Sequence, residues 1–91
     1  MTILRIVNRG VDWETYDAIN AEVDIERRHP LGLIMHGACE VGGTVRVAQV
    51  WDSEEYAQRF DEETLKPALK AVGAPLKAEV TTFELHHLVT P

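Results

Sequence analysis

The sequence predicts an α+β domain in which one four-stranded antiparallel sheet is covered by helices on one face. The 91 residues are 45% hydrophobic and 26% charged, which is enough for one domain and too few for two. Strand-like and helix-like patterns follow one another in the order βαββαβ, the order of a split βαβ sandwich. No linker or low-complexity tract interrupts them, so residues 1–91 are treated as a single domain.

The first strand and the first helix are predicted from side-chain type and spacing. Residues 2–8 are rich in β-branched and apolar side chains and are followed by a turn at Gly10. A helix is predicted over residues 12–28, because Asp12 fits an N-cap and apolar residues then recur at helical spacing. Pro30 ends this helix, since proline disfavours helical geometry at the residue before it.

Two further strands are predicted over residues 31–41 and 44–52, joined by the glycine pair at 42–43. Two adjacent glycines can adopt the positive φ angles of a two-residue hairpin turn. If Val41 lies opposite Thr44, the register of the whole hairpin is fixed.

This register predicts that His36 faces Gln49 and that Ile34 faces Trp51. Side chains on a strand alternate between the two faces of the sheet. One face then carries Ile34, His36, Ala38, Val45, Val47, Gln49 and Trp51, and the other carries Leu33, Met35, Cys39, Arg46, Ala48 and Val50. Both faces are largely apolar, so we expect the hairpin to be covered on both sides.

The second helical region is predicted to begin at Asp52 or Ser53, either of which can serve as its N-cap. One helix is expected over about residues 53–64. A second piece follows, with Pro67 in its first turn and Gly73 at its end.

The last strand is predicted over about residues 76–88. His86 and His87 are neighbours on this strand and point to opposite faces, so they cannot bind one metal ion together. We expect His87, which is in phase with Phe83, to face the helices. The sheet order expected for this chain places the strand far from His36, so the two histidines would flank a ligand without touching.

Four groups of residues carry a family resemblance. They are His36-x-Ala38, then Val47-x-x-Val50-Trp51-Asp52-Ser53 followed by Arg59-Phe60, then Leu65-x-Pro67-Ala68-Leu69, and finally His86-His87-Leu88. With them the chain resembles the dimeric α/β-barrel superfamily, in particular small uncharacterised relatives of the antibiotic biosynthesis monooxygenase family. The resemblance implies a ferredoxin-like sandwich, two copies of which pair sheet to sheet, and a ligand site between sheet and helices in each subunit. The superfamily includes oxygenases of polycyclic phenols, polyketide cyclases, isomerases, haem-degrading enzymes and members without known activity, so fold does not fix the reaction.

Charge and composition exclude several kinds of partner. The formal net charge is -6, from 15 acidic and 9 basic residues, and no basic cluster is present, so neither nucleic acid nor an anionic membrane is expected. The first five residues form too short an apolar run for a signal or membrane segment. Cys39 is the single cysteine, so no intrachain disulfide can form and a cytoplasmic location is expected. The two-sided apolar hairpin predicts a homodimer.

His36 is the candidate catalytic residue, because an imidazole on an apolar strand can transfer a proton near neutral pH. Gln49 and Trp51 lie on the same face, and together the three side chains suit an aromatic ligand. The alternative is that Gln49 merely satisfies His36 within a packed sheet. Asn20 and Tyr56 are the candidates for orienting a phenolic or carbonyl oxygen.

The leading hypothesis is therefore a homodimeric enzyme that acts without a metal or organic cofactor on an aromatic or polyketide-like molecule. His36 would be catalytic, and the substrate-binding residues would be Asn20, Gln49, Trp51, Tyr56 and His87. Oxygenation is the first expectation from the resemblance, and cyclisation or isomerisation is the second. A non-catalytic dimer that binds a small ligand or has a structural role is the alternative from another class. Haem binding through His36 or His87 is a third possibility.

Overall fold

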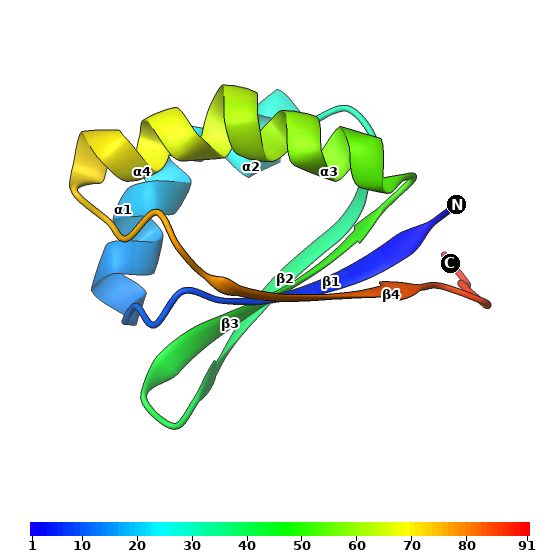
Figure 1. Ribbon diagram of the computed structural model, residues 1–91, viewed down its shortest axis with the longest axis horizontal. Helices are drawn as coiled ribbons and strands as arrows, with labels where there is room; N and C mark the ends of the chain where they lie inside the picture. The colour runs from blue at the N-terminus through cyan, green and yellow to red at the C-terminus, as the bar shows by residue number, and fades with distance from the viewer.

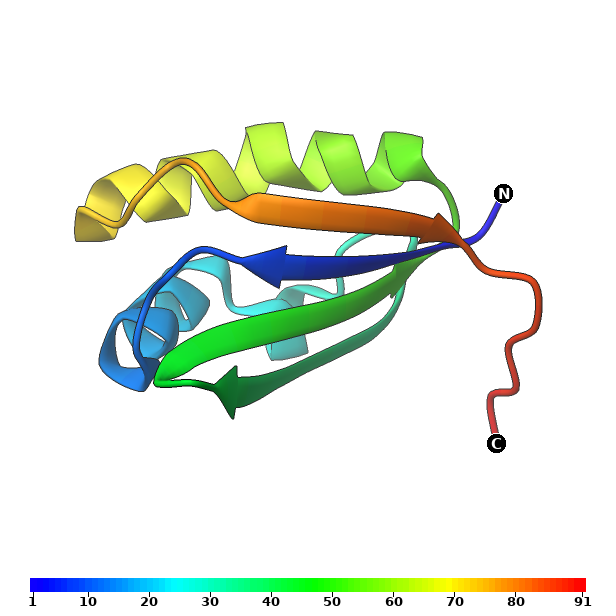
Figure 2. The ribbon, with the colours of Figure 1, turned by 60° about the horizontal axis from the view of Figure 1, so that its bottom comes forward.

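The computed structural model describes all 91 residues and shows one four-stranded antiparallel sheet with the helices on one face (Figures 1 and 2). The strands are β1 (Ile3–Asn8), β2 (Leu33–Val41), β3 (Thr44–Trp51) and β4 (Glu79–Glu84). They lie in the order β2-β3-β1-β4, with every neighbouring pair antiparallel. The predicted ferredoxin-like α+β fold is thus confirmed, and β2 and β4 lie at opposite edges of the sheet.

The first helical region is divided into α1 (Trp13–Val23) and α2 (Ile25–Arg28). Asp12 caps α1 as predicted, since its carboxylate accepts a hydrogen bond from the Thr15 N–H at 2.9 Å. The prediction of one continuous helix over residues 12–28 is wrong, because Asp24 adopts a left-handed conformation with φ 53°. Val23 and Ile25 are about 200° apart on a continuous helix. The break at Asp24 lets both of them pack against the same core.

The second helical region runs from α3 (Glu54–Phe60) through the π-helical segment η1 (Asp61–Leu65) into α4 (Lys66–Val72). Ser53 is the N-cap, and its hydroxyl accepts from the Tyr56 N–H at 3.5 Å. Pro67 lies in the first turn of α4, and Gly73 ends α4 with φ 70°, as predicted. The two expected pieces are not separated. The widened turn of η1 joins them, and in it the Lys66 N–H bonds to the carbonyl of Asp61.

The hairpin register is as predicted from Met35 to the turn, and His36 lies opposite Gln49. At the start of β2 an irregularity between Leu33 and Met35 inserts one extra residue. Leu33 therefore pairs with Trp51, and the predicted pairing of Ile34 with Trp51 is wrong.

Strand β4 is shorter than the predicted strand over residues 76–88, and the chain after it runs past the end of the sheet (Figure 2). His87 lies outside the strand and is exposed, so the prediction that it faces the helices is wrong. Phe83 is paired with Leu4, on the face of the sheet turned away from the helices. The alternation on β4 thus runs in the phase opposite to the predicted one.

The core lies between the sheet and the helices and contains Ile3, Val23, Trp51, Ala57, Phe60 and Ala68. The other face of the sheet has no helix over it (Figure 2). By register this open face carries Leu4, Ile6, Met35, Ala48, Val50 and Phe83. Met35 and Phe83 are 49% and 52% exposed, so part of the predicted second apolar face is left uncovered by the chain itself. No helix has both the length and the apolar character needed to cross a membrane.

Candidate functional site

A cavity of about 100 Å³ lies between the helix-facing side of the sheet and helix α1 with segment η1. It is lined by 17 residues, of which 11 are hydrophobic. The other six are Arg5, Arg9, Asn20, His36, Gln49 and Asp61, and Tyr16, one of the hydrophobic residues, adds a polar hydroxyl group. Pockets for drug-sized ligands hold about 300–1,000 Å³. This cavity therefore accommodates a group of a few heavy atoms, and a larger ligand has to extend out of its open side.

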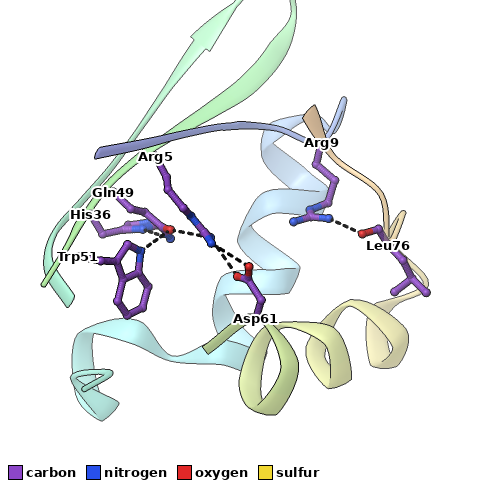
Figure 3. A network of polar contacts seen from close by, with 7 residues as sticks. All are labelled: Arg5, Arg9, His36, Gln49, Trp51, Asp61 and Leu76. Atoms are coloured by element: carbon purple, nitrogen blue, oxygen red, sulfur yellow. Dashed lines mark hydrogen bonds and ion pairs between the residues drawn. The ribbon is translucent and has the colours of Figure 1, made fainter. Parts of the chain in front are cut away.

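Gln49 is the centre of a hydrogen-bond network in the cavity wall (Figure 3). Its carbonyl oxygen Oε1 accepts from Trp51 Nε1–H at 3.0 Å and from Arg5 Nη2–H at 3.2 Å. Its amide nitrogen Nε2 lies 3.2 Å from His36 Nδ1, because the two residues are directly opposite in the hairpin. Gln49 is only 5% exposed, so these three contacts satisfy an amide that water does not reach.

His36 joins this network to helix α1. Its second ring nitrogen, Nε2, lies 2.9 Å from the hydroxyl oxygen of Tyr16, and the two rings are nearly parallel. Burial lowers the pKa of His36 below its ordinary value. The imidazole is consequently neutral near pH 7, in a position between an amide and a phenol.

Arg5 carries the network across to the helical layer. It is 5% exposed on the central strand β1, in the same alternation as Ile3 and Val7. Two of its nitrogens bind the carboxylate of Asp61, Nη1 to Oδ2 at 2.8 Å and Nη2 to Oδ1 at 3.0 Å. Asp61 is the first residue of η1, and π-helical turns are frequent at functional sites. The remaining nitrogen, Arg5 Nε, is buried without a hydrogen-bond partner.

Arg9 lies at the other end of the cavity (Figure 3). Its Nη1 donates to the carbonyl oxygens of Pro75 and Leu76 at 3.2 and 3.0 Å, which fixes the loop that leads into β4. The pKa of Arg9 is lowered, chiefly by burial. Two guanidinium groups and the Asp61 carboxylate give the cavity lining a formal charge of +1 when His36 is neutral. The lining therefore favours a ligand that carries negative charge or lone pairs.

The structure brings together only some of the residues that the sequence predicted. His36, Gln49 and Asn20 line the cavity. Trp51 is fully buried behind it and contacts the site through Gln49. Tyr56 and His87 are not part of the lining: the Tyr56 ring packs against Gly32 and under Arg59, and His87 is exposed beyond β4.

Four polar residues of the cavity were missed by the sequence analysis. Arg5 carried a usable signal, because a charged residue in the buried phase of an apolar strand needs a partner. Tyr16 fits the apolar stripe of its helix, Asp61 belongs to an acidic run, and Arg9 lies at a turn. No group of three or more His, Cys, Asp or Glu side chains is close enough together to hold a metal ion.

No family model and no curated protein sequence matches this chain. Several solved structures match its fold over almost the full length. SnoaB, a cofactor-independent oxygenase from Streptomyces nogalater, is 13% identical with a TM-score of 0.65, over 99% of this chain and 96% of that one. A protein from Chloroflexus aurantiacus, proposed to be an antibiotic biosynthesis monooxygenase, is 14% identical with a TM-score of 0.62, over 99% and 100%. Heme-degrading protein Rv3592 from Mycobacterium tuberculosis is 18% identical with a TM-score of 0.60, over 99% and 100%.

These likenesses show that the chain has the fold of the antibiotic biosynthesis monooxygenase-like proteins. The same fold is found in an oxygenase and in a heme-degrading protein. The reaction has to be argued from the site, because one fold supports many chemistries.

Proposed function

We propose that this protein is a cofactor-independent enzyme, similar to the antibiotic biosynthesis monooxygenases, that acts on an aromatic or polyketide-like substrate bearing an oxygen. One observation carries the proposal: the hydrogen-bonded pair of His36 and Tyr16 lies in the wall of a largely apolar cavity. SnoaB, which shares this fold, is a cofactor-independent oxygenase, and this supports the choice of reaction class.

The polar side chains of the cavity are unlike ordinary core packing. Burying an arginine and a glutamine beside a half-buried histidine costs free energy that apolar residues of similar size would not. What this arrangement supplies is a fixed set of dipoles and positive charge around the position of a substrate oxygen. Such a field stabilises the enolate or phenolate that forms when an aromatic ketone loses a proton from the carbon beside its carbonyl, or a phenol loses its hydroxyl proton, to water at the open side of the cavity.

Oxygenation then follows the balance R₂CH₂ + O₂ → R₂C=O + H₂O, in which the substrate carbanion is the reductant and no organic cofactor is consumed. A substrate of this type exceeds the cavity volume of about 100 Å³. We therefore propose that its oxygen-bearing end enters the cavity while the remaining rings lie toward the open side.

We also propose that the active form is a homodimer paired through the open face of the sheet. Leu4, Ile6 and Phe83 on that face are apolar and have no helix over them. The cavity lies on the opposite side of the sheet, so each subunit would keep its own site.

The test is oxygen uptake together with mass spectrometry, using a panel of phenols, naphthols and anthrones. Consumption of O₂ with conversion of CH₂ to C=O supports the oxygenase. Conversion to an isomer or a dehydrated product without O₂ uptake indicates an isomerase or cyclase, and binding without conversion indicates a ligand-binding protein. In the oxygenase, His36→Ala should lower turnover about 100-fold or more with an unchanged circular dichroism spectrum, because the Tyr16 hydroxyl loses the group that holds it in position. Glu63→Gln, an exposed site on the same helical layer, is the control. Unchanged turnover in His36→Ala would remove His36 from the mechanism.

A further inference from the structure

We propose that Tyr16 is the side chain that contacts the substrate, and that it donates its hydroxyl hydrogen to a substrate oxygen. His36 is then a positioning residue, in place of the proton-transfer group that the sequence suggested. This assignment rests on the proposed small-molecule function of the cavity, and it follows from the direction of each hydrogen bond in the network.

The donor and acceptor roles in the network are fixed first at the side-chain amide of Gln49. Its Oε1 contacts Arg5 Nη2 and Trp51 Nε1, and both of these groups can only donate hydrogen bonds. The opposite amide orientation would place an NH₂ group against two donors. The carbonyl of Gln49 is therefore fixed toward Arg5 and Trp51, and its NH₂ group is fixed toward His36.

The orientation of the Gln49 amide in turn fixes the donor and acceptor nitrogens of the His36 imidazole. An NH₂ group facing Nδ1 requires Nδ1 to be the acceptor, so a neutral His36 carries its proton on Nε2. A proton on Nδ1 would meet the amide donor of Gln49 at 3.2 Å. Burial also disfavours the doubly protonated ring. Neither nitrogen is thus free to take a proton from a substrate in this arrangement.

Tyr16 is the end of the network. Its oxygen accepts the Nε2–H of His36 at 2.9 Å, and its own hydrogen has no acceptor in the structure. Tyr16 lines the cavity, so an oxygen of a bound ligand can accept this hydrogen. Burial and the nearby carboxylates of Asp17 and Glu26 raise the pKa of Tyr16, which keeps the phenol protonated and able to donate.

A second unused donor belongs to the same cavity. Arg5 Nε is buried and has no acceptor, which is rare for a buried polar atom and calls for an explanation. A ligand oxygen bound near Tyr16 and Arg5 would supply one if the Arg5 side chain shifts on binding, because this Nε has almost no accessible surface in the ligand-free protein. The site should consequently prefer carbonyl, enolate or phenolate oxygens over groups that can only donate.

The first test is the tautomer of His36 in the ligand-free protein, read from two-bond ¹H–¹⁵N correlations of the imidazole at pH 7. We expect Nε2 to be protonated and Nδ1 to be bare. In Gln49→Glu the carboxylate can still accept from Arg5 and Trp51, while its other oxygen demands a proton on Nδ1, so the Nδ1 signal should change to that of a protonated nitrogen. A wild-type ring that carries its proton on Nδ1 would overturn the inference, whether or not the protein turns over any substrate.

The second test compares benzaldehyde with toluene, two probes of similar size that differ in one acceptor oxygen, by NMR titration. The wild type should bind benzaldehyde about tenfold more tightly, the effect of one good hydrogen bond. Tyr16→Phe should lose this preference and keep its affinity for toluene. Tyr56→Phe, a half-buried tyrosine outside the cavity, should keep the preference. Equal binding of the probes by the wild type, binding of neither, or a preference retained in Tyr16→Phe contradicts the inference. The expected results without any turnover would refute only the enzymatic proposal.

Discussion

The ion pair between Arg5 and Asp61 offers the sharpest test of how the site is held together. It joins the central strand to the π-helical turn across 56 residues of sequence. The guanidinium is 7% exposed and the carboxylate 36% exposed, so the charge that water cannot reach is the positive one. Asp61→Asn keeps the shape of the side chain and removes the charge that compensates Arg5.

The size of the effect can be worked from these contacts. Breaking a fully buried pair costs about 3–5 kcal/mol, and a hydrogen bond to a charged group contributes about 1.5–3 kcal/mol. Because Asp61 is partly solvated and asparagine keeps one acceptor, we expect about 2 kcal/mol of lost stability. With an unfolding entropy of about 2.1 cal/mol/K per residue, this lowers Tm by about 10 °C for a chain of 91 residues.

The assay is thermal unfolding followed by circular dichroism, at one protein concentration because association would shift Tm. Glu63→Gln is the matched control, since Glu63 is exposed and takes part in no ion pair. It should change stability by less than about 0.5 kcal/mol. If Asp61→Asn is as stable as the control, the guanidinium of Arg5 is solvated in a way that this structure does not show, and the account of the buried network fails.

Three further predictions concern the rest of the molecule. Burial lowers the pKa of His36, so just below pH 6.5 the unfolded chain binds more protons than the folded one. As pH falls from 7.5 to 5, the free energy of unfolding in urea should therefore decrease more for the wild type than for His36→Gln. Equal dependence of this free energy on pH in the two proteins would contradict the prediction. Gly32→Ala and Gly10→Ala both place alanine at positive φ, but only at position 32 does the new Cβ lie 2.4 Å from a tyrosine ring. Gly32→Ala should therefore lower the denaturant midpoint clearly more than Gly10→Ala. Equal decreases in the two midpoints would rule out the close contact. In analytical ultracentrifugation the wild type should have twice the 10.2 kDa mass of one chain. Phe83→Glu should convert the dimer to a monomer, while Leu31→Glu, at an exposed apolar site outside the sheet, should leave the dimer intact. A monomeric wild type would refute the proposed dimer.

Much of the fold could be predicted because its local signals agree with one another. The glycine pair at 42–43 fixes the turn of the hairpin, and strand alternation then carries the register as far as His36 opposite Gln49. The irregularity between Leu33 and Met35 and the break at Asp24 could not be predicted in this way. Both depend on which side chains the finished core accepts, and this information is not local.

The residues of the site, too, divide into those that local sequence signals predict and those that depend on the tertiary structure. His36 and Gln49 could be paired from the register, but Tyr16 reaches His36 from a helix whose orientation the sequence does not determine. The pairing of Arg5 with Asp61 spans most of the chain, and no spacing rule connects the two residues. An acidic residue in an acidic run is usually solvated, so Asp61 had no distinguishing feature until the fold placed it.

The π-helical segment η1 has a consequence for how this chain can vary in length. Ala57 and Phe60 before it, and Ala68 and Leu69 after it, are all buried. In an uninterrupted α-helix, with about 100° of rotation per residue, the second pair would point about 100° away from the first. The wide turn absorbs one residue and brings both pairs to one side. The helical layer thus holds one residue more than its packing requires, so deletion of Glu63 should yield a continuous α-helix with the same buried side, and natural relatives can differ by a single gap at this point.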